Sequence, residues 1–403
     1  MPQKLLFISN GHGEDAIGAR LAQEFQRLCP DWQLEAVPIV GAGTPYECLG
    51  ITVSGPRWSP PSGGFTFTSV QRFLEDWRDG MRHHTHAQHW AVRRAKADIV
   101  IVVGDVYALG VTRLFAFKEA TPVVFQVQPL VSRYYQDGMS AATRLERLNR
   151  VTVDNFTAPE LFLMRRMVRH VFVRDARTAT WLQELGVGHS SFLGNLMMDC
   201  LTPELDLTPI LENKPLLALL PGTRGDHLYS LPKMLEVAAL LPEFQVLAAL
   251  PKLDPNLELS TGWVWKPVEA VDNSLSVLRT AQHHSGQCVN ILSNAFAALL
   301  HRADVVLGTS GTGNEQAVGL GKPVVSFATR GPQYTRNFAK AQQRLLGAGL
   351  VFVDKPVDNS SLSEAVRQAY KNRELAQKAG WERMGPAGGA ARVAAKILEL
   401  LNA

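Results

Sequence analysis

A glycine-rich segment has the residue types and spacing that bind a diphosphate. Residues 305 to 315, VVLGTSGTGNE, are typical of a strand end, a glycine loop and a helix start. Backbone N–H groups of such a loop approach an anion closely, and the helix N-terminus adds favourable partial charge. Ser310 and Thr312 can donate hydroxyls, and Glu315, expected in the first helical turn, is suited to accept both hydroxyls of a ribose. The alternative is an ordinary helix cap, in which Thr312 or Asn314 satisfies the helix and Glu315 completes it.

A second loop of the same kind follows the expected strand at 216 to 220. Its sequence, PGTRGD at 221 to 226, carries Arg224, whose forked guanidinium neutralises phosphate in a way that lysine cannot reproduce. The alternative is a surface arginine beside a turn. Two anion-suited loops at strand ends of one sheet favour a binding function.

The first expected helix opens with GHGEDAIG at 11 to 18, directly after a strand. Its glycines are one residue too far apart at the third position for a dinucleotide fingerprint, so we predict no dinucleotide site. The acidic pair Glu14 and Asp15 would repel a diphosphate and is better placed for an acceptor hydroxyl. The alternative for this pair is compensation of the helix dipole.

Asp105 follows a run of five aliphatic residues at 99 to 103 and Gly104. A carboxylate at the end of a strand can act as a general base toward an acceptor hydroxyl, and Asp105 is the candidate. His12 could share that role. The alternative for Asp105 is a turn cap.

Four histidines, His83, His84, His86 and His89, lie close together in an expected helix. No carboxylate or cysteine is interleaved with them, so a solvated face is favoured over a metal site. Nearby aromatic and basic residues could dip into a bilayer surface: Phe65, Phe67, Phe73 and Trp77, with Arg72, Arg78 and Arg82.

The elements that position these residues belong to a large globular protein. With 403 residues, 46% hydrophobic and 19% charged, the chain is expected to form two domains of roughly 200 residues each. The net charge of +4 is too small to indicate nucleic-acid binding but suits an anionic substrate. The four cysteines are widely spaced, which predicts neither disulfides nor zinc and indicates a reducing compartment. The N-terminus lacks a secretory pattern and no apolar run reaches roughly 20 residues, so we expect a cytoplasmic protein whose membrane contact, if any, is peripheral.

Strands and helices are expected to alternate in both halves, which predicts α/β domains with parallel sheets. The expected strands of the first half are residues 5–9, 36–40, 51–53, 99–103, 121–127 and 169–173. Those of the second half are residues 216–220, 244–250, 305–307, 324–327 and 351–353, with helical stretches between them. The proline-rich segment at 202 to 214 is the expected interdomain connection. The expected domains are therefore residues 1 to 205 and 213 to 380, followed by a last helical segment at 381 to 403.

The sequence resembles lipid-A-disaccharide synthase, and more particularly the divergent group related to it. The resemblance rests on four motifs in the family's order: GHGEDAIGARL at 11 to 21, FLGNLMMD at 192 to 199, LLPGTRGD at 219 to 226, and ADVVLGTSGTGNEQAVGLGKPVVSF at 303 to 327. The last motif alone would also suit cell-wall N-acetylglucosaminyltransferases and UDP-N-acetylglucosamine 2-epimerases.

This resemblance implies a GT-B fold, in which two Rossmann-like doubly wound domains face a cleft. It implies a UDP-sugar donor of the N-acetylglucosamine type, no cofactor and no required metal, inversion at the anomeric carbon, and a lipid-linked acceptor at the membrane face. The N-terminal domain would hold the acceptor and the C-terminal domain the nucleotide-sugar. The last helix would cross back onto the N-terminal domain.

The resemblance also implies roles for residues of the motifs. Glu315 would hold the ribose, Ser310, Gly311 and Thr312 the diphosphate, and Arg224 a phosphate or the donor sugar. Asp105 would be the base, with His12 and Glu14 beside it. We also count among the expected nucleotide-sugar-binding residues Gly222, Thr223, Gly313, Asn314 and Gln333. The family has a Ser-Gly-Asp run where this chain has Gly13-Glu14-Asp15, so the departures lie on the acceptor side.

Two other functions fit the same residues. A sugar-nucleotide epimerase would need acidic residues at the donor sugar and would release a free product. A non-catalytic UDP-sugar-binding protein would bind without turnover.

Overall fold

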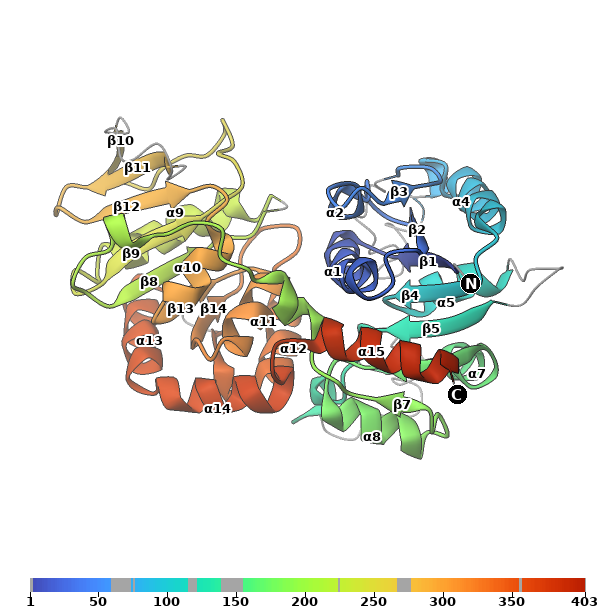
Figure 1. Cartoon of the computed structure of the whole chain (residues 1–403). Helices are drawn as coiled ribbons and strands as arrows, with labels where there is room; N and C mark the ends of the chain where they lie inside the picture. The colour runs from blue at the N-terminus through green and yellow to red at the C-terminus, as the bar shows by residue number, and fades with distance from the viewer. Residues whose placement is uncertain are drawn as a thin grey trace. The chain divides into compact units, whose positions relative to one another are not determined.

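The computed structural model describes residues 3–58, 74, 77–114, 122–138, 155–223, 225–266, 277–354 and 357–402. Its contacts divide the chain into two compact units (Figure 1). Unit 1 comprises Met1–Cys200 and Pro386–Ala403, and unit 2 comprises Leu201–Gly385. Each unit is built around one sheet. None of the helices in the described ranges has the length and apolar character needed to cross a bilayer.

The described part of unit 1 contains a parallel sheet in the order β3-β2-β1-β4-β5-β6-β7. Its strands are β1 (Lys4–Ser9), β2 (Gln33–Pro38), β3 (Thr52–Val53), β4 (Ile99–Val103), β5 (Val123–Val127), β6 (Val168–Phe172) and β7 (Ser190–Ser191). The strand order reverses at β1, which lies between β2 and β4. This is the doubly wound arrangement in which ligands bind at the carboxyl ends of the strands beside the reversal. The predicted parallel sheet of the first half is confirmed.

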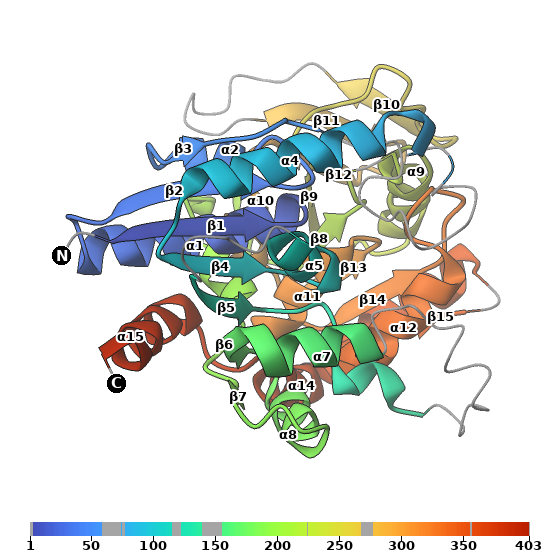
Figure 2. The same cartoon turned by 90° about the vertical axis from the view of Figure 1, so that its right-hand side faces the viewer.

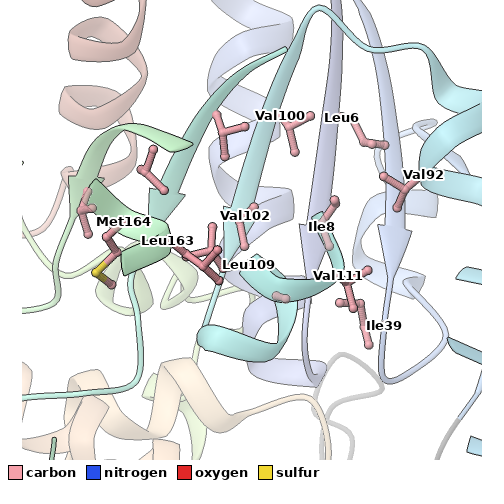
Figure 3. Close-up of a cluster of buried hydrophobic side chains, with 14 of the residues drawn as sticks. Leu6, Ile8, Ile39, Val92, Val100, Val102, Leu109, Val111, Leu163 and Met164 are labelled. Atoms are coloured by element: carbon pink, nitrogen blue, oxygen red, sulfur yellow. The ribbon is translucent and has the colours of Figure 1, made fainter. Parts of the chain in front are cut away.

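Helices cover both faces of this sheet because its strands are apolar on both sides. One face packs on α4 (Met81–Ala95), α5 (Val106–Leu114), α7 (Ala158–Met167) and α8 (Ala176–Glu184), of which α4, α5 and α7 stand in front of the sheet in Figure 2. The other face packs on α1 (His12–Leu28), α2 (Thr44–Glu47) and α15 (Gly389–Asn402). Figure 3 shows the first of these cores, where Leu109 of α5 lies among Val102, Leu163 and Met164.

The Asp199 carboxylate is one of the contacts that hold the last helix in unit 1. Asp199, in the 3-10 helix Leu196–Cys200, accepts hydrogen bonds from the backbone N–H groups of Gly388 (2.5 Å) and Ala390 (2.6 Å). These N–H groups lie at the start of α15, where a helix has no intrahelical acceptors for them. Val393 and Ile397 of α15 are fully buried in the core that contains α1.

The described part of unit 2 contains a sheet in the order β10-β11-β12-β9-β8-β13-β14-β15. Its strands are β8 (Leu216–Leu220), β9 (Gln245–Ala249), β10 (Trp263–Lys266), β11 (Val277–His283), β12 (Cys288–Leu292), β13 (Val305–Gly308), β14 (Val324–Phe327) and β15 (Leu350–Val353). Its helices are α9 (His227–Ala238), α10 (Phe296–Arg302), α11 (Gly311–Gly319), α12 (Arg336–Leu346), α13 (Asn359–Lys371) and α14 (Arg373–Met384). The six parallel strands reverse their order at β8, between β9 and β13. Two parallel-dominated sheets with helices confirm the expected α/β fold class.

The prediction of only helical stretches between residues 250 and 305 is wrong. This segment contains β10, β11 and β12, and the pairs β10–β11 and β11–β12 are antiparallel. β10 alternates between buried Trp263 and exposed Val264. Strands that bury one face lack the continuous apolar run by which the central parallel strands were recognised.

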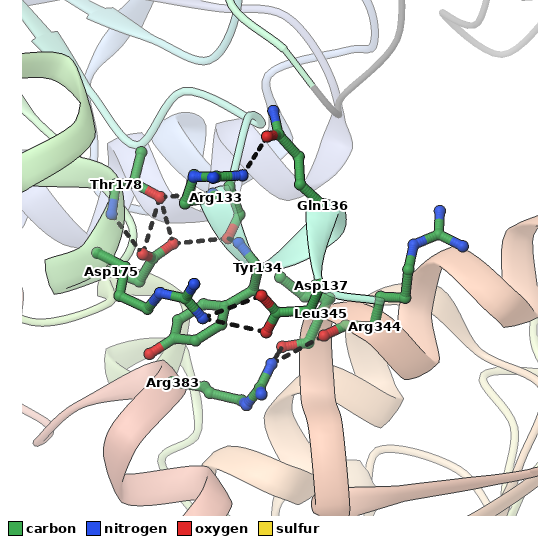
Figure 4. Close-up of polar contacts among 11 residues, drawn as sticks. Arg133, Tyr134, Gln136, Asp137, Asp175, Thr178, Arg344, Leu345 and Arg383 are labelled. Carbon is green, nitrogen blue, oxygen red and sulfur yellow. Dashed lines mark hydrogen bonds and ion pairs between the residues drawn. The ribbon is translucent and has the colours of Figure 1, made fainter. Parts of the chain in front are cut away.

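Side-chain caps hold helix ends within each unit (Figure 4). In unit 1, the Asp175 carboxylate accepts hydrogen bonds from the backbone N–H of Thr178 and from the Ser132 hydroxyl, which joins the start of α8 to the loop after β5. In unit 2, the Arg383 guanidinium donates to the backbone oxygens of Arg344 and Leu345, each at 2.8 Å. In both places a side chain provides hydrogen-bond partners for polar groups near a helix end, which such groups need when they are removed from water.

We predict that Asp199→Ala loosens α15 from unit 1. The variant loses two hydrogen bonds to a carboxylate at a helix N-terminus, which is worth about 1–3 kcal/mol of unfolding free energy. Urea denaturation of the variant and the parent measures this difference. Asp31→Ala, which removes an exposed aspartate of the same unit, is the control and should change the free energy by less than about 0.5 kcal/mol. Equal loss in both variants would contradict the anchoring role.

Candidate functional site

Three loops meet at the carboxyl edge of the unit 2 sheet, beside the reversal at β8. The loop after β8 contains Gly222, which has a φ of +79°, and a Cβ at this position would lie 3.2 Å from the backbone oxygen of Thr309, after β13. The loop after β14 is tied to the first loop by Asp226, whose Oδ1 accepts the backbone N–H groups of Gln333 (3.2 Å) and Tyr334 (2.9 Å). The two predicted anion loops therefore lie side by side.

Helix α11 starts at Gly311, and Ser310 is its N-cap. The Ser310 hydroxyl accepts the backbone N–H of Gly313 at 3.2 Å. The alternative interpretation, in which Thr312 or Asn314 caps the helix, is therefore wrong, because the helix begins earlier than the glycines suggested. Glu315 is the fifth residue of α11, which corrects its expected place in the first turn. It lies one turn beyond Gly311 and hence on the same face of the helix.

A buried hydrogen-bond network supports the loop between β13 and α11. Asn314, fully buried, donates to the backbone oxygen of Gly308 (3.2 Å), the Tyr334 hydroxyl (3.1 Å) and the Gln342 Oε1 (2.9 Å). Gln342 donates in turn to the backbone oxygen of Gly311 at 2.7 Å. The structure thus places the Asn314 side chain in support of the loop. Only glycine fits at 308, since a Cβ there would lie 2.1 Å from Asn314 Oδ1.

The other expected nucleotide-sugar residues surround the same edge. Ser310 and Gly311 are half-buried, Thr312 and Thr223 are exposed, and Gly313 is buried. Gln333 is half-buried, and its backbone is held by Asp226. Arg224 lies outside the described residues.

Some polar groups at this edge have no protein partner among the described residues. The Thr309 side chain is 2% exposed, and its hydroxyl has no hydrogen-bond partner among the described residues. Buried polar atoms without partners are rare in folded proteins and require an explanation. The first N–H groups of α11 likewise have no intrahelical acceptor. An anion at this edge would meet backbone donors, hydroxyls and the positive end of a helix.

Asp105 lies at the corresponding edge of unit 1, beside the reversal at β1. Its Oδ1 accepts hydrogen bonds from the Asn10 side chain (2.9 Å) and the backbone N–H of Tyr107 (3.1 Å). Burial raises the pKa of Asp105, against the lowering effect of these hydrogen bonds. A carboxylate with a raised pKa is a better proton acceptor than an ordinary aspartate, so the position suits a general base.

His12 and Glu14 lie beside the same edge. A Cβ on Gly104, directly before Asp105, would lie 3.3 Å from Glu14 Cγ. Gly41, with a φ of +107°, leaves room for the His12 ring, because a Cβ there would lie 3.1 Å from Nδ1. The structure therefore gathers the three expected catalytic residues at one edge of unit 1.

Asp15 does not form an acidic pair with Glu14 for an acceptor, contrary to the sequence interpretation. Its carboxyl is 1% exposed and accepts the Ser9 hydroxyl at 2.5 Å. Burial raises the pKa of Asp15 to about 6, with the Ser9 hydroxyl and the Gly43 backbone opposing the rise. Successive residues of a helix point in directions about 100° apart, so Glu14 and Asp15 face different surroundings.

The histidines of α4 have aromatic and polar neighbours. His84 stacks on Trp58 with ring centroids 4.9 Å apart, and His86 accepts the Trp90 indole N–H at 3.0 Å. Burial, followed by His86 and Arg93, lowers the pKa of His89. The described residues contain no group of three or more His, Cys, Asp or Glu side chains placed to hold a metal ion.

Sequence reasoning missed the residues that support these edges. Tyr334 and Gln342 act through contacts between loops far apart in the sequence, and no local pattern marks them; Asp226 belongs to the PGTRGD motif, but its contact with the loop after β14 is not visible in that motif. Asn10 could have been suspected from its place between a strand and a helix. Glu160 forms a Thr-x-x-Glu capping box, which marks a helix start but not a buried carboxyl.

We predict that Asp15→Asn flattens the pH dependence of stability between about pH 4 and pH 6. The pKa of Asp15 rises from 3.8 to about 6 on folding, so the folded parent holds a proton that the unfolded chain has released. The parent therefore loses up to about 3 kcal/mol of unfolding free energy as pH rises through this range. Urea denaturation at several pH values measures both slopes. Parallel curves for the two proteins would contradict the raised pKa.

No model of a known protein family matches the sequence, and no curated protein does so. Solved structures are similar along the whole length. The calicheamicin glycosyltransferase is 16% identical to this chain, with a TM-score of 0.64. The match covers 100% of this chain and 98% of the glycosyltransferase. The glycosyltransferase of kitacinnamycin is 16% identical with a TM-score of 0.60 and 99% coverage of both chains. The UDP-GlcNAc 2-epimerase of Neisseria meningitidis, solved with UDP-GlcNAc, is 16% identical with a TM-score of 0.57 and 99% coverage of both chains. The chain thus has the two-unit α/β fold of GT-B glycosyltransferases and these epimerases.

Proposed function

We propose that the chain is a UDP-sugar-dependent glycosyltransferase that moves a sugar of the N-acetylglucosamine type to a lipid-linked acceptor. The observation that carries the proposal is the edge of unit 2 beside β8, where a capped helix N-terminus, two glycine loops and the buried Thr309 hydroxyl converge. These are the groups that bind a diphosphate. The likeness to an epimerase solved with UDP-GlcNAc supports the choice of nucleotide.

In the proposed donor site, Ser310, Gly311 and Thr312 bind the diphosphate at the start of α11. Glu315, one turn further on the same face and 7% exposed, accepts the ribose hydroxyls. A ribose attached to a diphosphate lies a few ångströms from it, which matches a separation of one helical turn. The other proposed contacts are made by Gly222, Thr223, Arg224, Gly313 and Gln333, whereas the buried Asn314 side chain supports the loop from within the protein.

In the proposed reaction, Asp105 takes the proton of the acceptor hydroxyl, with His12 and Glu14 beside it. The hydroxyl oxygen then forms a bond to the anomeric carbon. The bond from this carbon to the diphosphate breaks, and UDP leaves with the electron pair. Attack opposite the leaving group inverts the anomeric carbon. Backbone N–H groups at α11 stabilise the charge that develops on the diphosphate, so the proposal needs neither a cofactor nor a metal.

A lipid-linked acceptor and peripheral membrane contact are supported by the exposed face of α4. On α4, Trp90 is 43% exposed, and Arg93 and Arg94 lie over its ring; Trp77, which precedes the helix, is 50% exposed. The helix from Met81 to Ala95 contains no acidic residue. Basic and aromatic side chains on one helix suit an anionic membrane surface. Of the other residues expected there, Phe65, Phe67, Arg72 and Phe73 lie outside the described ones.

A UDP-sugar 2-epimerase is the second candidate, favoured by the likeness to solved 2-epimerases. The two functions differ in their products, because a transferase joins the sugar to an acceptor and an epimerase releases an isomerised sugar. Incubation with labelled UDP-N-acetylglucosamine and a lipid extract separates them. A labelled lipid supports the transferase, an isomerised sugar supports the epimerase, and binding without turnover indicates a non-catalytic protein.

We predict that Glu315→Ala weakens UDP binding at least about tenfold, because a charge-assisted hydrogen bond to each ribose hydroxyl is lost. Titration calorimetry with UDP measures the dissociation constants. Glu364→Ala, which removes an exposed glutamate from α13 of the same unit, is the control and should bind UDP as the parent does. Unchanged affinity of the Glu315 variant would remove the ribose assignment.

Asp105→Asn should bind UDP normally and lose turnover.

A further inference from the structure

Glu160 is a buried carboxyl that the proposed reaction does not use. It is the third residue of α7 and forms a capping box with Thr157: each side chain bonds the backbone N–H of the other residue, at 3.4 and 3.3 Å. The side chain is 2% exposed, and Oε1 has no hydrogen-bond partner among the described residues. The capping box uses only one carboxyl oxygen, so it does not explain the burial of the other.

The start of α7 places Glu160 next to the start of α5. Leu163 and Met164, three and four residues after Glu160, share its face of α7 and pack in the core with Leu109 of α5 (Figure 3). Leu109 is in turn four residues after Asp105, whose backbone oxygen accepts its N–H at 3.2 Å. Glu160 therefore lies one helical turn before Leu163 and Met164 on α7, and Asp105 lies one turn before Leu109 at the start of α5. Both helices begin at the carboxyl edge of the sheet.

The charges around the two groups agree with this placement. Burial, followed by the negative charge of Asp105, raises the pKa of Glu160 to about 8, and the Thr157 backbone opposes the rise. Tyr107 of α5, whose pKa burial raises, is neutral at this pH. On β6, which also packs against α7, Arg169 is exposed and His170 is bonded to Ser191 at 2.8 Å. Within the described part of unit 1, Asp105 is the charge that acts on Glu160.

We propose that Glu160 is a positioning residue for the acceptor-side base: with Asp105 it forms a carboxyl pair that holds one proton at neutral pH. The role rests on the proposed function, in which Asp105 accepts the proton of the acceptor hydroxyl. With Glu160 in its acid form, Asp105 is the single negative charge of the pair. Two adjacent carboxyls release their protons in separate steps, because ionisation of one opposes ionisation of the other.

The experiment follows the carboxyl carbon of Glu160 by NMR in the full chain labelled with 13C-glutamate. In the parent, one glutamate signal should titrate near pH 8, and Glu160→Gln should remove it. Glutamine at this position retains the capping box, so the variant is expected to fold. In Asp105→Asn, the midpoint of this signal should shift to lower pH. Glu24→Gln, which changes another buried glutamate of unit 1 that pairs with Arg20 and Arg27, should leave the midpoint near pH 8.

The proposed role is then read from the pH profile of sugar transfer. The parent should show a second ionisation near pH 8 that Glu160→Gln lacks, a difference that loss of a purely structural contact would not produce. Titration of every glutamate near its ordinary pKa, or a midpoint unchanged in Asp105→Asn, would overturn the pair. Identical pH profiles of sugar transfer for the parent and Glu160→Gln would overturn the positioning role. If the parent transfers no sugar to any lipid, the proposed function and this role fail together, whereas the NMR titration still decides the pair.

Discussion

The Asp226 carboxylate accepts two backbone N–H groups from the loop after β14, and the edge of unit 2 depends on this tie. It holds that loop against the one after β8, and the backbone comes so close that a Cβ at Gly331 would lie 2.2 Å from Asp226 Oδ1. Asn314, Tyr334 and Gln342 add a second layer below the start of α11. Because buried hydrogen bonds strengthen as solvent is excluded, these contacts fix the backbone donors of α11 before any ligand arrives.

Unit 1 uses buried carboxyls in a different way. Asp226 is held by backbone donors, whereas Asp15, Asp105 and Glu160 have pKa values raised mainly by burial. Removing a carboxylate from water disfavours its charged form, so these groups retain protons at higher pH than exposed acids do. Such an edge suits the exchange of protons with a hydroxyl, while the edge of unit 2 suits the binding of an anion. The same doubly wound sheet thus supports two kinds of chemistry through the loops at its carboxyl edge.

The likeness to both transferases and 2-epimerases follows from this division. Both kinds of protein share the fold, and the reaction is decided by the side chains that meet the sugar and its acceptor. In this chain, the proposed acceptor-side residues lie on short loops and first helical turns of unit 1, around Asn10 and Asp105. These positions are also where the sequence departs from the family it resembles, as in the run Gly13-Glu14-Asp15.

The sequence by itself determined the central strands, the two glycine loops that follow β8 and β13, and the position of Asp105 after β4. These features are local, because a continuous apolar run followed by glycine specifies a buried parallel strand and its turn. Only the tertiary structure decided that β10 to β12 extend the second sheet, that Glu315 lies in the second turn of α11, and that Asp15 is buried beside Ser9. It also decided that α7 packs on α5, and this packing brings Glu160 to a place where burial and then the charge of Asp105 raise its pKa although the two residues are far apart in the chain. Burial and charge at such places are sums over many neighbours, which no short stretch of sequence contains.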